Sequence, residues 1–116
     1  MIDTIFVANR TARLLKMEII GHADTNPEKR LICCAASTLA YTMAQIVTDY
    51  QKTKKLAVKP IITDKKGHMV IEIRPKKKYY GLVKLHLAHT KRGFDMLHAN
   101  YPEDVAETTY IDATSK

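Results

Sequence analysis

Residues 4–20 read TIFVANRTARLLKMEII, two apolar runs on either side of a short polar turn. In the second run, Leu15, Met17 and Ile19 alternate with charged residues, which is the two-residue period of a strand with one buried face. Gly21 ends this run. The segment therefore predicts a pair of antiparallel strands joined by a tight turn.

Two helices and a second hairpin are predicted further along the chain. Apolar residues recur at steps of three and four over about 33–50 and again over about 80–100, so each segment has one apolar face. Between them, alternating apolar residues flank a turn at 64–67, and Pro60 places the first strand of this hairpin at an edge or a bulge. The C-terminal segment either adds a short strand at 108–111 or stays loose.

The predicted order of elements is ββαββα. Because hairpins make antiparallel pairs, we expect an α+β fold in which two helices cover one face of an antiparallel sheet of about four strands. The length of 116 residues suits one hydrophobic core, so residues 1–116 are expected to form a single domain.

Composition restricts the class of protein. With 46% hydrophobic and 27% charged residues, the chain is typical of a soluble globular protein. Asp3 and the lack of a basic segment before an apolar one predict that no signal peptide is present. The uncharged run 31–48 nearly has the length of a membrane span, but hydroxyl and amide side chains interrupt it. We therefore expect an amphipathic helix, no membrane contact and a cytoplasmic protein.

Basic residues are concentrated in the middle of the chain. The formal net charge is +7, and lysines and arginines crowd the segment 52–78. A solvated basic surface is one interpretation, and a ribosome or RNA contact through the basic hairpin is the other. Only Tyr79 and Tyr80 lie close to this segment as stacking candidates, and no RRM-type signature is present.

Two adjacent cysteines, Cys33 and Cys34, begin the first predicted helix. Neighbouring cysteines cannot form an ordinary disulfide, because its geometry requires Cα atoms farther apart than one peptide step. The thiols are therefore expected to be reduced, as in a cytoplasmic protein, and to serve either packing or chemistry.

His22 follows the second predicted strand and is a candidate base for one of these thiols. A helix N-terminus presents unpaired N–H groups and a partial positive charge, which favour a thiolate and can hold an oxyanion. A nearby imidazole can take the thiol proton, as in cysteine hydrolases. The intervening loop, which contains Asp24, Pro27 and Glu28, can close over an extended peptide. On spacing alone, however, one histidine with two cysteines is more often structural than catalytic.

The segment GHADTNPEKRLICCAASTL, residues 21–39, resembles the motif of the ribosomal-processing cysteine protease family, Prp or YsxB-like. That motif is roughly G-H-A, a loop, then D-x-V-C-A-A-x-S-x-L. The segment GFDMLHANYPEDV, residues 93–105, is similar to the family's last helix and its Tyr-Pro exit. The resemblance covers most of the chain. It implies a cysteine endopeptidase that removes the N-terminal extension of a large-subunit ribosomal protein, acts as a homodimer and uses no cofactor.

Two alternatives to the processing of a ribosomal protein stay open. Some members of the family are encoded among phage structural genes and process capsid or scaffold proteins. A non-catalytic module that binds the ribosome or RNA is an alternative from another class, and it rests on the basic hairpin.

The resemblance assigns His22 as the general base and leaves two registers for the nucleophile. A loop without gaps places the family cysteine at Cys34. An alignment on the helix places it at Cys33, puts the family serine at Ser37 and requires one deletion in the loop. Loops tolerate deletions, whereas a one-residue slip turns every helical side chain by about 100°. We therefore predict Cys33, with Cys34 as the alternative. The other residues predicted to support the site are Gly21, Ala23 and Ser37.

The chain departs from the family pattern at one position of the site. The acid three residues before the family cysteine is replaced by Arg30 or Leu31, depending on the register. Asp24 and Glu28 are the carboxylates that can orient His22 in its place.

No metal site is expected. His86 and His89 lie one turn apart on the second predicted helix and can clamp a metal, but no third ligand is apparent.

Overall fold

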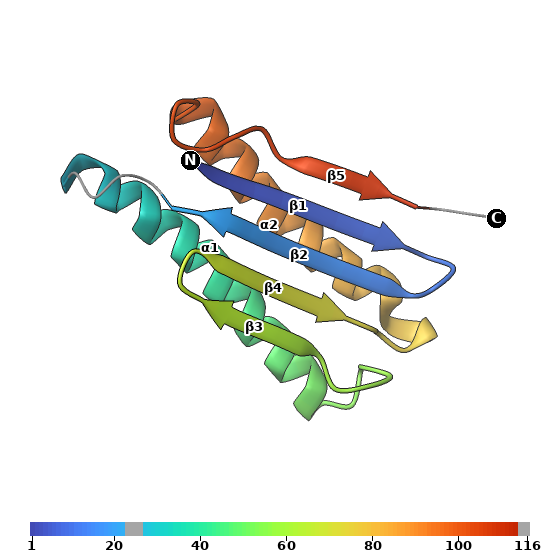
Figure 1. The fold of residues 1–116 in the computed structure, drawn as a ribbon. Coiled ribbons are helices and arrows are strands. Elements are labelled where there is room, and N and C mark those ends of the chain that lie inside the picture. Colours follow the sequence, from blue (N-terminus) through green and yellow to red (C-terminus); the bar gives the residue numbers. More distant parts are fainter. Residues whose placement is uncertain (23–26, 114–116) are drawn as a thin grey trace.

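The computed structural model describes residues 1–22 and 27–113, with the side chain of Glu28 left aside. These residues form a five-stranded sheet and two long helices in the order ββαββαβ (Figure 1). The strands are β1 (Ile2–Asn9), β2 (Leu14–Gly21), β3 (Ile61–Lys65), β4 (His68–Ile73) and β5 (Thr109–Asp112). The helices are α1 (Pro27–Lys52) and α2 (Tyr80–Asn100), and the short 3-10 helix η1 (Lys77–Tyr79) precedes α2.

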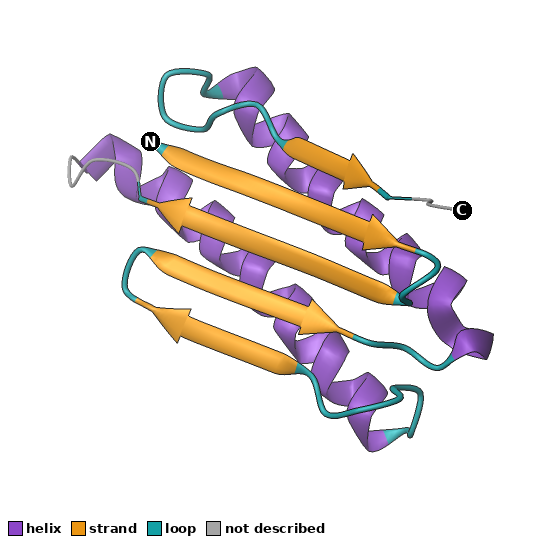
Figure 2. Cartoon of the chain, turned by 45° about the vertical axis from the view of Figure 1, so that its right-hand side comes forward, coloured by secondary structure: helices purple, strands orange, loops and turns teal. Residues whose placement is uncertain are grey.

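Both long helices lie on one face of the sheet, so the predicted α+β class is confirmed (Figure 2). The strand order is β3-β4-β2-β1-β5, and the pairs β1–β2, β2–β4 and β3–β4 are antiparallel. The expected number of about four strands is too low, because β5 joins the free edge of β1 in parallel. An unpaired edge exposes N–H and C=O groups, and the β-branched and aromatic residues of β5 are suited to cover them.

The predicted apolar faces form the core. The alternating β2 residues are buried against α1 and α2, and the Phe6 and Phe94 rings meet with centroids 6.1 Å apart. The helical residues that pack against the sheet are Ala36, Ala40, Met43 and Val47 of α1 and Val83, Leu87 and Phe94 of α2. By length and composition alone, Lys29–Lys52 could also cross a membrane. In this fold its apolar face is used for packing within the chain.

Helix α1 begins at Pro27, so the predicted start near residue 33 is wrong. Proline suits the first helical position, because its fixed φ matches the helix and its missing N–H needs no partner there. The polar residues that follow have the composition of a loop, but they occupy an accessible first turn. Lys29 there forms an ion pair with Asp104 at 2.8 Å. The predicted bounds of α2, by contrast, are confirmed.

The strand before the second turn is shorter than predicted, because β3 starts only at Ile61. Pro60 has no N–H to donate to a ladder, and the segment before it makes only an isolated bridge, between Leu56 and Pro75. β3 is one of the two edge strands of the sheet, in agreement with the edge position that Pro60 suggested.

Helices α1 and α2 approach each other closely at Gly93. A Cβ atom added to Gly93 would lie 2.5 Å from Cδ2 of Leu39 on α1. The missing side chain therefore admits the Leu39 branch, and this glycine serves helix packing.

Candidate active site

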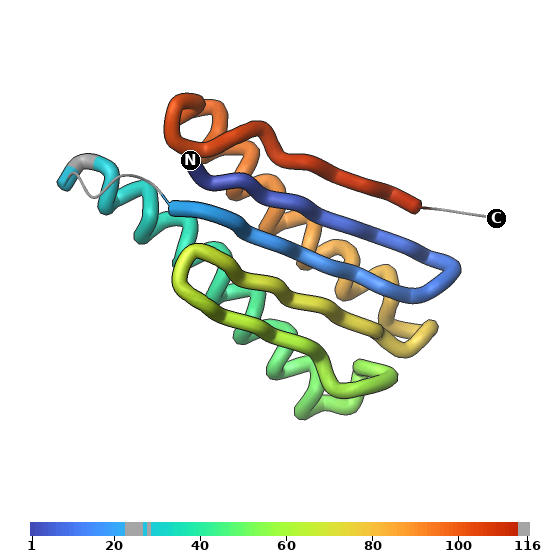
Figure 3. The backbone as a smooth tube through the Cα atoms, viewed as in Figure 1, coloured from blue at the N-terminus to red at the C-terminus, as the bar shows by residue number. Residues whose placement is uncertain are grey.

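A cavity of about 260 Å³ lies where the end of β2, the first half of α1 and the β3–β4 turn meet. Its polar lining comes from His22, Cys33, Ser37, Tyr41, Asp64, Lys65, Lys66 and His68. Its apolar lining comes from Ile2, Ile19, Ala36, Ala40 and Met69. The backbone trace shows the start of the chain beside the end of β2, with the β3–β4 turn close to α1 (Figure 3).

The structure places one of the two predicted thiols in this cavity. Cys33 is half-buried and lines it together with His22, whereas Cys34 is exposed and is not among the lining residues. Neither thiol is in a disulfide. Ser37 follows Cys33 by one helical turn and lines the same cavity. The helical face that carries Cys33 and Ser37 therefore lines the same cavity as His22.

The backbone at His22 is held from two sides. Gly21 has φ +96°, and a Cβ there would lie 2.1 Å from the carbonyl oxygen of Met1, so only glycine fits. Its N–H donates to the carbonyl oxygen of Gly67 at 2.8 Å. The α-ammonium group of Met1 donates to the His22 carbonyl oxygen at 3.1 Å. These bonds fix the direction in which the imidazole leaves β2.

The β3–β4 turn forms the third wall of the site, and the sequence predicts it only as a turn. Gly67 has φ +76°, which a tight hairpin turn requires, and a Cβ on it would lie 3.4 Å from Nδ1 of His22. The missing side chain of Gly67 therefore leaves room for the exposed imidazole beside this turn. The Lys66-Gly67 pair indicates the turn in the sequence, but nothing local indicates its contact with His22.

A side-chain bond joins this hairpin to the helix that carries Cys33. The Tyr41 hydroxyl on α1 donates to the Asp64 carboxylate on β3 at 2.6 Å. This bond, followed by the charge of Asp64, raises the pKa of Tyr41 above its usual 10.0. The two residues are far apart in the sequence, so its pattern could not predict the pair.

The predicted role of the α1 N-terminus is wrong. Cys33 follows the first helical residue, Pro27, by six positions, and the unpaired N–H groups of a helix belong to its first four residues. The effect of the helix dipole also falls off within the first turn. The N–H groups around Cys33 are helix-interior groups, so they are not available to an oxyanion.

The predicted substrate loop lies partly outside the residues that the structure describes. Ala23 and Asp24 lie outside the described residues, and Pro27 is exposed at the start of α1. Among the described residues, Asp64 is the carboxylate that lines the cavity, and Glu18 lies near its rim, where it pairs with His68 at 2.6 Å.

Within the described part of the chain, no three His, Cys, Asp or Glu side chains are gathered as a metal ion would require. His86, considered as a zinc ligand with His89, instead forms a hydrogen bond with the Tyr50 hydroxyl between the two helices. Its ring also lies against Tyr50, with centroids 5.5 Å apart.

Comparison with solved structures finds the same fold in known proteins. SMU.848 from Streptococcus mutans is 22% identical with a TM-score of 0.67, over 97% of this chain and 98% of that chain. The essential ribosomal processing protease Prp from S. aureus, solved with a substrate peptide, is 18% identical with a TM-score of 0.66, over 95% and 99%. The same protease with a covalently linked product peptide is 17% identical, with a TM-score of 0.63 over 97% and 99%.

No curated protein matches this chain in sequence. The family model described as cysteine protease Prp matches residues 1–106 of the 116. The chain therefore belongs to the cysteine protease Prp family.

Proposed function

We propose that this protein is a cysteine endopeptidase in which Cys33 is the nucleophile and His22 the general base. The observation that carries the proposal is the shared cavity, which His22 and Cys33 line from two different elements and which does not include Cys34. Membership in a family of cysteine proteases supports the same reaction class.

The proposed reaction has two stages. His22 takes the proton of the Cys33 thiol, and the sulfur attacks the carbonyl carbon of the scissile peptide bond. The imidazolium then gives this proton to the leaving amine, which departs as the new N-terminus of the product. In the second stage His22 removes a proton from water, the water oxygen attacks the thioester, and the thiol is restored as the acid product leaves.

Ser37 is the hydroxyl donor that we place beside the sulfur. It lies one helical turn from Cys33 on the same cavity wall, and its O–H can donate to the thiolate or to the oxygen of the tetrahedral intermediate. This assignment replaces the helix N–H groups, which are paired within α1 at this point.

The proposed substrate is the N-terminal extension of a large-subunit ribosomal protein. The relative from S. aureus is described as a ribosomal processing protease and was solved with a substrate peptide. The cavity of this chain has an apolar floor and a rim with charged residues at one end of the sheet, which suits an extended peptide segment.

Selective alkylation of the two thiols tests the catalytic pair. At about pH 6, where an ordinary thiol is almost fully protonated, iodoacetamide should modify Cys33 well before Cys34. His22→Ala should abolish the difference. Faster labelling of Cys34 would assign the nucleophile to the other register, and slow, equal labelling of both would mean two packed thiols.

Cleavage of a peptide that spans the junction of an N-terminal extension tests the activity itself. Cys33→Ser should remove cleavage, while Cys34→Ser, the matched control one position along the same helix, should retain most of it. Cleavage that survives Cys33→Ser would refute the assignment.

A further inference from the structure

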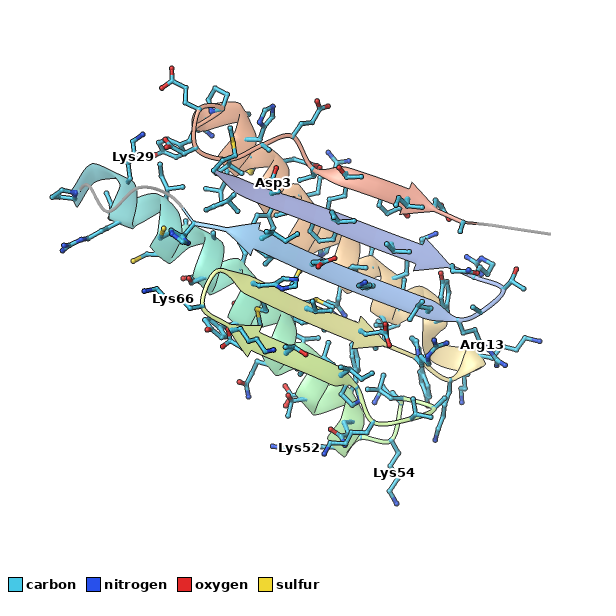
Figure 4. The ribbon with its side chains drawn as sticks, in the orientation of Figure 1. Asp3, Arg13, Lys29, Lys52, Lys54 and Lys66 are labelled. Carbon is cyan, nitrogen blue, oxygen red and sulfur yellow. The ribbon has the colours of Figure 1, made fainter. Side chains whose placement is uncertain are left out.

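A second cavity, of about 350 Å³, lies at the end of the molecule opposite to the candidate active site, and its lining is basic. Arg10 and Arg13 come from the β1–β2 turn, Lys77 comes from η1, and Thr11 and Tyr80 complete the lining. Arg13 lies at this end, far from Lys29 and Lys66 at the other (Figure 4). We propose that this cavity binds a phosphate group of a nucleic-acid backbone.

Two segments that are distant in the sequence bring the cations together. The Arg74 guanidinium, after β4, reaches the Ala12 carbonyl oxygen of the β1–β2 turn at 3.5 Å. The segment 74–78 therefore runs beside that turn. We define the basic end by the cations of these two segments, which are Arg10, Arg13, Arg74, Lys76, Lys77 and Lys78.

The cations that line the cavity have no ion-pair partner among the residues that the structure describes. Among the described residues, the ion pairs use other side chains than Arg10, Arg13 and Lys77. Asp112, whose charge acts on Tyr80, is itself paired with Lys84 at 3.6 Å. Like charges placed side by side without a carboxylate repel one another, and an anion in the cavity would remove this repulsion.

Tyr80 gives the cavity a fixed aromatic wall and an unused polar group. Its side chain is only 3% exposed, and its buried hydroxyl has no hydrogen-bond partner among the described residues. The Arg10 guanidinium lies over its ring, 5.1 Å from the centroid, a cation–π contact that holds the guanidinium in place. An arginine held in this way can present its fork of donors to phosphate oxygens at little entropic cost.

The backbone of the β1–β2 turn holds two of the cations close together. Arg13 adopts φ 50°, a left-handed conformation in which glycine is the least strained residue. Its N–H donates to the Arg10 carbonyl oxygen at 3.1 Å, so the strained turn sets these two arginines at one site.

The spread of charge favours a nucleic acid over an isolated phosphate ion. The cations extend from the cavity along 74–78, and next to them the Tyr79 ring has the ammonium groups of Lys55 and Lys78 at 5.5 and 5.6 Å from its centroid. One phosphate would leave most of these charges without a partner. A row of phosphates beside an aromatic side chain is what a nucleic-acid strand offers.

A binding titration with matched variants tests the proposal. Fluorescence anisotropy measures the affinity for a labelled single-stranded RNA of about 16 nucleotides, which spans a typical single-strand site. The test variant is Arg10→Gln/Arg13→Gln. The control is Lys65→Gln/Lys66→Gln, which removes the same charge from the opposite end of the sheet. Inorganic phosphate at constant ionic strength is the second ligand.

The arginine variant should lose about tenfold in affinity. Its slope of log K against log salt should become shallower by about 1.4, because each phosphate contact with a single strand contributes about 0.7 to the slope and two contacts are lost. The lysine control should change affinity less than about twofold. Equal losses in both double variants, or no RNA binding at low salt, would overturn the site. Binding of inorganic phosphate as tight as that of RNA would overturn a nucleic acid as its occupant.

This inference is independent of the proposed peptidase function. The arginine variant should retain the selective labelling of Cys33, because the two cavities share no lining residue. A protein that binds RNA without cleaving peptides would contradict only the peptidase, and the reverse result would contradict only the basic cavity.

Discussion

Replacing Gly93 with alanine would push a methyl group into the contact between the two helices. The added Cβ would lie 2.5, 2.8 and 3.2 Å from Cδ2, Cδ1 and Cγ of Leu39. Carbon atoms pack favourably at about 3.5–4.0 Å, so the Leu39 branch has to withdraw by about 1 Å. Leu39 is half-buried and packs against the core, so moving its branch disturbs those contacts.

The expected free-energy change is the difference between two effects. Overpacking of this kind costs about 1–3 kcal/mol, whereas alanine is favoured over glycine in a helix by about 1 kcal/mol. Gly93→Ala should therefore lower the free energy of unfolding by about 1 kcal/mol. Gly81, on the same helix, is exposed, and a Cβ added there would have nothing within 4 Å. Gly81→Ala should accordingly be stabilising, by up to about 1 kcal/mol.

Urea unfolding of the two variants, followed by circular dichroism, measures both changes. Leu39→Ala completes the test, because it removes the branch that the new methyl group would meet. In that background Gly93→Ala should become stabilising, which gives a coupling free energy of about 2 kcal/mol between the two sites. The reasoning is refuted if Gly93→Ala stabilises the wild-type protein as much as Gly81→Ala does.

Three further predictions concern the hairpin, a carboxylate and the assembly. Asp64→Asn should bring the pKa of Tyr41 back toward 10.0 in an ultraviolet titration, and an unchanged titration would mean that their bond is absent in solution. The pKa of Asp95 is lowered: burial raises it, but hydrogen bonds from Lys91 and Thr108 outweigh burial. Asp95→Asn should therefore cost under about 1 kcal/mol of stability at neutral pH; this cost should begin to fall near pH 4, about the unfolded pKa, and vanish only below the lowered pKa of the folded state, and a constant difference would contradict it. Light scattering should give a homodimer of twice 13.2 kDa that Leu85→Glu, on the exposed face of α2, disrupts; a wild-type monomer would contradict this.

The strands and helices that the sequence predicts correctly are those with an uninterrupted period. The alternation of Leu15, Met17 and Ile19 extends through β2, and the apolar stripe of α2 has the bounds that its period indicates. The sequence does not reveal the start of α1, because its first turn is polar and accessible and so carries no period. The sequence does not decide between a strand and a loose segment for β5, because four residues are too few to show a period. The parallel pairing of β5 also depends on which edge of the sheet is free.

The same distinction applies to the site. Cys33 and Ser37 share a face by helical spacing alone, so their common place in the cavity follows from periodicity wherever the helix begins. The wall made by Gly67 and Asp64 comes from a hairpin that is distant in the chain. Its contact with His22 depends on the order of strands in the sheet, which residue types do not encode locally.

The early start of α1 also changes what the proposed chemistry requires of the remaining residues. A thiol in the first turn would have both the dipole and the unpaired N–H groups of the helix to stabilise its thiolate. The thiolate would then depend less on the imidazole. Almost two turns further along, Cys33 has neither, so forming the thiolate depends on His22 and on what holds its ring. The Gly21 N–H bond to the Gly67 carbonyl fixes the backbone that carries His22, and the ring lies beside Gly67. A substitution in the β3–β4 turn should therefore affect the reactivity of a cysteine on α1, which the linear motif does not suggest.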